Sequence, residues 1–236
     1  MRFQKILKPF ALLVIVLILA PSVNAQGWNL GLDGGLNISS IKLVDKADHV
    51  TGEFSPRMGL HLSIFGEYGF SERWFVQLWL SYDARGAKYK DSYITQSGQQ
   101  YSNDLALRSN YFSLPVLMKY VLPASEKLDF YGQFGPGFSY LGWAKVKGTE
   151  TLDGSTSEIN ERLGDTWTKV TTSLIFGIGM EFNHTEHGST FVQVQYNLGL
   201  SDVHRQGFYY DQNNSDPDAR SHVITITVGA KGKVGD

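Results

Sequence analysis

The chain has 236 residues, no cysteine and a formal net charge of −2. The lack of cysteine excludes disulfides, thiolate metal sites, a cysteine nucleophile and a lipidated N-terminal cysteine. The near-neutral charge and the absence of a basic run give no indication of a nucleic-acid-binding surface. One domain fits this length, and the many glycines and aromatic residues favour an all-β protein.

The first 25 residues have the pattern of a secretory signal peptide. Residues 2–8 carry three positive charges, residues 10–20 form a short apolar region, and Val23–Ala25 fits the small-residue cleavage rule. A retained membrane helix is the alternative, and the short apolar region and its flanks disfavour it. We therefore expect an exported protein whose mature part, residues 26–236, forms one domain.

Eight later segments alternate apolar and polar side chains with a period of two. They lie near residues 28–41, 55–70, 73–89, 108–122, 127–145, 166–182, 190–203 and 220–234. Side chains alternate across a β-strand, so each segment has one apolar face and one polar face. In the third segment the apolar face is Trp74, Val76, Leu78, Leu80 and Tyr82.

The connections between these segments alternate in length. The three near residues 71–73, 123–126 and 183–189 are short. The four near residues 42–54, 90–107, 146–165 and 204–219 are long and polar. An up-and-down antiparallel sheet gives this order when one rim has tight turns and the other has loops. The pattern predicts an eight-stranded antiparallel up-and-down β-barrel.

Aromatic residues near both ends of the apolar faces indicate that lipid covers the outside of this barrel. Outer-membrane barrels carry aromatic girdles at both membrane interfaces. The interval from Trp74 to Tyr82 is nine residues, which matches the 9–11 residues, roughly, that a tilted strand needs to cross hydrocarbon. The predicted girdle residues are Trp28, Tyr68, Trp74, Tyr82, Tyr120 and Tyr140.

The polar faces are then predicted to fill the lumen. An eight-stranded barrel has an interior just wide enough for its side chains. Glycines share the polar-face parity and would make room for bulky inward residues such as Phe65, Trp79 and Tyr131. The charged residues predicted to face the lumen are Asp33, Arg57, His61, Glu67, Asp83, Arg85, Lys119, Asp129 and Glu181. We expect them to pair with one another, because an unpaired buried charge is costly; a path for ions is the alternative.

Two prolines interrupt the pattern. Pro115 lies on the inward parity and Pro136 on the opposite one. Proline cannot donate a hydrogen bond to a strand ladder, so we expect a bulge or a local break beside it.

Several stretches resemble the PorT-like outer membrane β-barrel family of Bacteroidetes. They are "GWNLGLDGGLNISS", "FSPRMGLHLSIFGEY", "YFSLPVLMKY", "FYGQFGPGFSYLG" and "SLIFGIGMEF". The resemblance covers the whole mature chain and implies an eight-stranded outer-membrane barrel with periplasmic termini and extracellular loops. Members mostly lack a defined biochemical activity, and the founding branch is linked to protein secretion and gliding. The ending "GAKGKVGD" departs from the terminal aromatic of many outer-membrane barrels.

No established catalytic or phosphate-binding motif is present in the sequence. The segment His184–His187 could bring metal ligands together, but a solvated turn is the simpler interpretation. The stretch "DQNNSDPD", residues 211–218, lacks the glycine and the glutamate of a calcium loop. His49, Asp202 and His204 are the only candidate enzyme residues near the outer rim. We therefore predict no catalytic residue, no metal and no cofactor.

The resulting functional hypothesis is a non-enzymatic scaffold or interaction protein of the outer membrane. Its long extracellular loops would contact other envelope or secretion proteins, and its other partner would be outer-membrane lipid. A narrow channel for small solutes or ions is the alternative, and an outer-membrane hydrolase is the less favoured third hypothesis.

Overall fold

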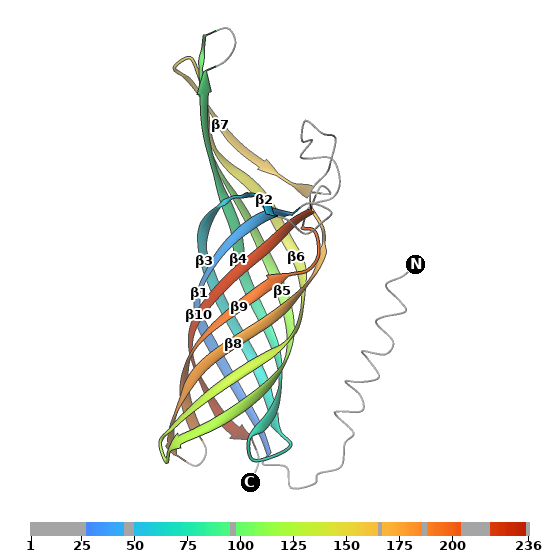
Figure 1. Ribbon diagram of the computed structural model, residues 1–236, viewed down its shortest axis with the longest axis vertical. Coiled ribbons are helices and arrows are strands. Elements are labelled where there is room, and N and C mark those ends of the chain that lie inside the picture. The colour runs from blue at the N-terminus through green and yellow to red at the C-terminus, as the bar shows by residue number, and fades with distance from the viewer. Residues whose placement is uncertain are drawn as a thin grey trace, which may run out of the picture.

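The computed structural model describes residues 27–44, 50–94, 98–164, 167–185, 188–203 and 218–234 (Figure 1). The predicted signal peptide and its cleavage site lie outside these residues. Among the described residues, no helix is long and apolar enough to cross a membrane.

Eight strands of the described part of the chain close into an antiparallel barrel, which confirms the predicted fold (Figure 1). They are β1 (Gly27–Val44), β3 (Ser55–Gly69), β4 (Trp74–Ile94), β5 (Gln100–Ser125), β6 (Leu128–Leu152), β8 (Val170–Thr185), β9 (Gly188–Gly199) and β10 (Asp218–Val234). Each pairs with the next along the chain, and β1 pairs with β10 from Trp28↔Val234 to Val44↔Asp218. The ring therefore leaves none of these eight strands with an open edge at membrane level, as a lipid environment requires.

The barrel wall separates apolar and polar side chains by parity. On β3, Leu62 and Ile64 are 48% and 59% exposed on the outside, whereas His61 and Ser63 are 5% and 6% exposed. In water such an arrangement would leave a large apolar surface unprotected, whereas lipid satisfies it.

Two predicted long loops are instead folded as β-structure. Strands β4, β5 and β6 continue beyond the barrel, where β6 also pairs with the added strand β7 (Ser155–Arg162). This four-stranded extension, the tower, rises at the top of Figure 1. We define the tower as residues 86–94, 100–108, 143–152 and 155–162. A further short strand, β2 (Val50–Glu53), pairs with the end of β1. The prediction of polar loops at 90–107 and 146–165 was therefore wrong.

The prolines leave a gap in the ladder without shifting its register. The pairing of β5 with β6 stops at Pro115↔Gly137 and resumes at Met118↔Phe134. The expected local break is confirmed, whereas no bulge occurs at this point. This strand pair has two register shifts, one at the short-turn end between Pro123 and Ser125 and one toward the tower. In the second, Asn110 faces Trp143 and Tyr111 faces Leu141, so that β6 carries one extra residue, Gly142.

That bulge reverses the parity of β6. Below it, odd-numbered residues such as Ser139 face the lumen, and above it Ala144 is the buried residue. Gly142 and Trp143 are both exposed, as expected where two residues on one strand oppose one on its partner. Lys145 and Lys147 consequently lie on the outer face of the tower.

Candidate functional site

The interior of the barrel is organised in successive layers, and β4 passes through all of them. From the short-turn end upward, Gln77 contacts an ion-pair layer, Trp79 belongs to an aromatic layer, Asp83 to a central polar layer and Ala87 to an apolar cap. All four side chains are buried.

The ion-pair layer is a neutral quartet of Glu67, Lys119, Glu181 and Lys231. Lys119 Nζ lies 3.1 Å from Glu67 Oε2 and 2.8 Å from Glu181 Oε2. Lys231 Nζ lies 2.8 Å from Glu181 Oε1 and also contacts Glu67 Oε1. Each cation therefore bridges two carboxylates that come from opposite parts of the wall. Burial of these charges is tolerated because every one of them is paired and hydrogen-bonded.

Lys231 was not among the lumen-facing charges predicted from the sequence. The alternation pattern already indicated an inward position for this residue, because Lys231 shares the inward parity of Thr225 and Thr227 on the last strand.

The aromatic layer fills the middle of the barrel. Phe65 stacks on Trp79 with ring centroids 4.1 Å apart, and Phe191 meets Phe65 edge-on at 5.7 Å. Glycines on neighbouring strands make room for the rings: a Cβ at Gly31 would overlap the ring of Phe65, and one at Gly229 would overlap that of Phe191. The predicted exchange of glycine for inward aromatic bulk is confirmed at these positions.

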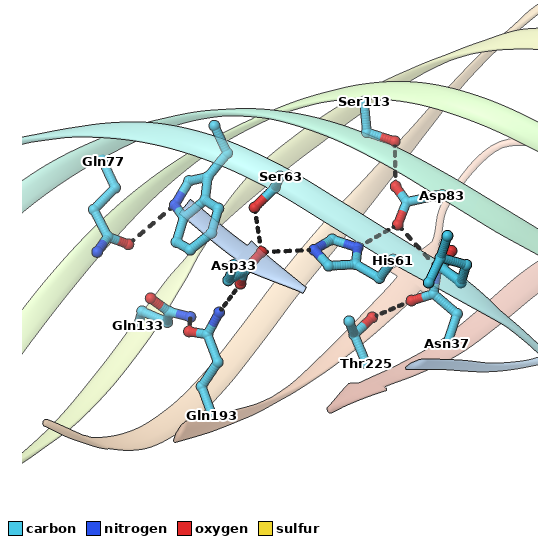
Figure 2. A network of polar contacts seen from close by, with 12 residues as sticks. Asp33, Asn37, His61, Ser63, Gln77, Asp83, Ser113, Gln133, Gln193 and Thr225 are labelled. Atoms are coloured by element: carbon cyan, nitrogen blue, oxygen red, sulfur yellow. Dashed lines mark hydrogen bonds and ion pairs between the residues drawn. The ribbon is translucent and has the colours of Figure 1, made fainter. Parts of the chain in front are cut away.

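The central polar layer is built around His61 (Figure 2). Its Nδ1 lies 2.7 Å from Asp83 Oδ1, and its Nε2 lies 3.3 Å from Asp33 Oδ1. Both ring nitrogens therefore face carboxylate acceptors, and only an imidazolium can donate to both. The ring ties β1, β3 and β4 together from inside the lumen.

Asp83 is the most connected group of this layer. It accepts from Arg85 Nη2 at 2.9 Å, Ser113 Oγ at 2.7 Å and Asn37 Nδ2 at 3.0 Å. On the other side, Asp33 accepts from Gln193 Nε2 at 3.0 Å. The charged members of this layer were predicted from the sequence, whereas the neutral amides were not, although they share the inward parity.

The structure places seven of the nine predicted lumen charges in these two polar layers. Arg57 and Asp129 differ, because both are only partly buried. Arg57 Nη1 donates to the carbonyl of Arg85 at 3.0 Å near the upper rim. Asp129 Oδ2 accepts from Asn183 at 2.8 Å near the lower rim.

An apolar cap lies above the central polar layer. Trp167 Nε1 donates to Tyr111 OH at 2.9 Å within it. Its buried members are Ile41, Ala87, Tyr111, Leu141, Ala144, Trp167, Val203 and Ala219. A cavity of about 260 Å³ adjoins the cap, between it and the inner face of the tower, where Leu105, Leu107 and Ile159 line it.

Aromatic pairs mark both edges of the lipid-facing band. At the short-turn edge, Trp28 packs on Tyr68 at 5.0 Å and Trp74 on Tyr120 at 4.7 Å between ring centroids. At the other edge, Phe112 lies between Tyr82 and Tyr140 in the ladder, with ring centroids of Tyr82 and Phe112 5.8 Å apart and Tyr140 55% exposed. The six predicted girdle residues thus fall into two rows, one at each rim.

The remaining candidates from the sequence do not assemble a site in the described residues. His184 Nε2 lies 2.8 Å from Thr190 Oγ1 in an exposed position, and Asp202 Oδ1 accepts from the backbone of Ala219. His49 and His204 lie outside the described residues, as does all but the last residue of the stretch 211–218. Within the described ranges, no group of three or more potential metal ligands occurs.

Residues 24–205 match the model of the family described as outer membrane protein beta-barrel domain. Among solved structures, the fold is similar to Neisserial surface protein A, with 14% identity, 89% of this chain and 99% of that chain covered, and a TM-score of 0.45. It is also similar to OprG of Pseudomonas aeruginosa (14%, 89% and 97%, 0.46) and to Ail of Yersinia pestis (16%, 87% and 99%, 0.40). No curated protein matches the chain.

Proposed function

The chain belongs to the outer membrane protein β-barrel domain family. We propose that it is a non-enzymatic scaffold with a closed lumen. Its location is the outer membrane, as the family implies. In this proposal the barrel anchors the tower, and the tower presents the surface that other proteins contact.

The observation that carries the proposal is the layered filling of the lumen. A channel needs a continuous hydrated path, but here a buried ion-pair quartet, a stacked aromatic layer and an apolar cap succeed one another along the axis. Hydrophobic constrictions oppose ion passage because they expel water. The filled lumen favours the scaffold over the channel hypothesis.

The tower supports a role in contact with other proteins. It is an ordered sheet extending the barrel by residues that pair strand to strand, from Ile94↔Gln100 to Leu152↔Ser155. Binding surfaces on rigid elements lose less entropy on association than flexible loops do. The resemblance to the PorT-like family directs the choice of partner toward proteins of secretion or envelope assembly.

Conductance of the purified barrel in planar lipid bilayers tests the closed lumen. We expect no steady single-channel current. In a second variant Phe65, Trp79 and Phe191 are all changed to Ala; because the ion-pair quartet and the apolar cap still close the lumen, this variant should also carry no steady current. Steady current through the unaltered barrel would contradict the scaffold proposal and support the channel.

Photocrosslinking in native outer membranes tests the contact surface. A photoreactive residue replaces Thr149 on the tower, and the matched control carries it at Lys127 in the turn at the opposite rim; both positions are exposed. We expect repeated capture of one protein at Thr149 and not at Lys127. An intact barrel that captures no protein at Thr149 would contradict the proposed role.

A further inference from the structure

A cluster of positive charges lies on the outer face of the tower. The register places Arg108 directly opposite Lys145, and Lys145 directly opposite Arg162, on the adjacent strands β5, β6 and β7. The next row along the same face adds two lysines. We call this cluster the basic patch: Lys88, Arg108, Lys145, Lys147 and Arg162.

The basic patch has no acidic partner among the described residues. The first ion pair on this face lies one row higher, where Lys90 Nζ is 3.4 Å from Asp104 Oδ2. Arg108 Nε is buried and makes no hydrogen bond. The pKa of Lys145 is lowered by desolvation and by the charges of Lys147, Arg108 and Arg162. Like charges directly opposite one another destabilise a sheet. An anion bound at the patch would relieve this repulsion.

The bulge in β6 is what brings the lysines here. Without the extra residue at Gly142, the odd-numbered Lys145 and Lys147 would continue the inward parity of Ser139. They would then enter the apolar cavity of the tower. The bulge also exposes Trp143, and Lys145 Nζ sits 4.9 Å from the centre of its ring.

The basic patch lies directly above the lipid-facing band. Phe112 belongs to the upper aromatic row, and Arg108 precedes it by four residues on β5, on the side of the tower. That interval is about 13 Å along a strand, or about 10 Å along the membrane normal at the usual strand tilt. The polar headgroup region is roughly 5–8 Å thick on each side. Long cationic side chains reach toward the interface, so the patch is within reach of lipid headgroups on the side of the membrane from which the tower rises.

We propose that the basic patch binds the phosphate groups of a phosphorylated outer-leaflet lipid. Arginine guanidinium groups bind phosphate bidentately, and lysines add point charges around them. Arg108 and Arg162 lie on either side of Lys145, which suits one phosphate bridging three strands. This inference is independent of the proposed scaffold role, because it needs no protein partner. It requires only that the tower lies on the outer-leaflet side of the membrane.

Native mass spectrometry of the barrel in neutral detergent tests this inference, with diphosphorylated lipid A as the probe. The test variant carries Arg108→Gln, Lys145→Gln and Arg162→Gln. The matched control loses three charges at the other rim, through Arg73→Gln, Lys127→Gln and Lys233→Gln. We expect the test variant to retain lipid A at least tenfold less than the unaltered barrel, and the control to retain it equally.

Three further arms identify the ligand and verify folding. Dephosphorylated lipid A should be retained no better than phosphatidylcholine, and dextran sulfate should not compete at concentrations equal to those of lipid A. Without lipid, the thermal midpoint of the test variant should rise by about 2 °C, because the charge repulsion is gone; this reading also shows that the variant folds. Equal retention of lipid A by the test variant would overturn the proposal, as would tighter binding of dextran sulfate than of lipid A.

Discussion

The barrel and the tower share three strands, but the surfaces that they present to their surroundings differ in chemistry, apolar on the barrel and polar on the tower. In the barrel part of β4, Leu80 points outward and Ser81 inward. A few residues later in the same strand, Lys88 points outward and Ala87 is buried. Pairing between β4 and β5 keeps one register through this change, so the side-chain parity is unaltered. What changes is the chemistry of the two faces: in the barrel the outward residues are apolar and the inward ones polar, and in the tower the reverse holds.

This difference shows that the surrounding solvent, rather than the fold, decides which face is apolar. Strand β5 repeats the exchange, from Leu114 outside and Ser113 inside to Arg108 outside and Leu107 inside. Lipid covers the outside of the barrel, so its polar groups must satisfy one another in the lumen. Water covers the outside of the tower, so the tower packs its apolar face inward like a soluble sheet.

The largest effect is expected when one charge is removed from the lumen. Lys119→Met leaves Glu67 and Glu181 with Lys231 as their remaining partner in the quartet. Loss of one member of a buried ion pair costs about 3–5 kcal/mol. Denaturant unfolding in lipid vesicles should show this loss. Lys127→Met, in an exposed turn, should change the free energy of unfolding by less than about 0.5 kcal/mol, and equal effects of the two would contradict the layered interior.

The second prediction places the same residue on the outer face of each region. Leu62→Arg puts a cation on the lipid-facing band of the barrel, at a cost of roughly 2–4 kcal/mol near the midplane. Ile94→Arg puts one at the end of the tower, where the side chain is 74% exposed, and should cost less than about 0.5 kcal/mol. Refolding yield into vesicles should fall for Leu62→Arg alone. A comparable loss for both variants would mean that the tower does not stand in water.

The third prediction concerns the interior of the tower. Leu107 lines its cavity and is half-buried, so Leu107→Ala should cost about 1–2 kcal/mol. Limited proteolysis should then cleave the tower faster, while the barrel keeps the gel mobility of the folded form. Thr149→Ala on the outer face serves as the control and should leave the cleavage rate unchanged. Simultaneous loss of the barrel would show that the two regions fold as one unit.

The barrel was predictable from the sequence because lipid and lumen impose one regular alternation on all eight strands. Parity predicted the inward side of the charged residues from Asp33 to Glu181, and position at the ends of the apolar faces predicted girdle residues such as Trp74 and Tyr120, but not their pairing. Which charges pair across the lumen was not predictable, because partners such as Lys119 on β5 and Glu67 on β3 come from strands that are not adjacent. Lys231 has the inward parity of the last strand, but it was omitted because the prediction for that strand considered mainly the apolar face.

The tower was missed for a physical reason. Its strands have lysines outside and leucines inside, which is the reverse of the pattern of a lipid-facing strand. Residues 90–107 therefore resembled a polar loop when they were compared with the lipid-facing strands. The extra residue at Gly142 was equally invisible, since a bulge needs the partner register to be recognised.

The exchange of polarity between the two regions can be measured directly with nitroxide labels. The chain has no cysteine, so Leu80→Cys and Lys88→Cys each provide a single attachment site on the same face of β4. In vesicles, oxygen concentrates in hydrocarbon and a nickel chelate stays in water. We predict that oxygen relaxes the label at residue 80 more strongly and that the nickel chelate relaxes the label at residue 88 more strongly. The same preference at both positions would contradict a membrane boundary between the barrel and the tower.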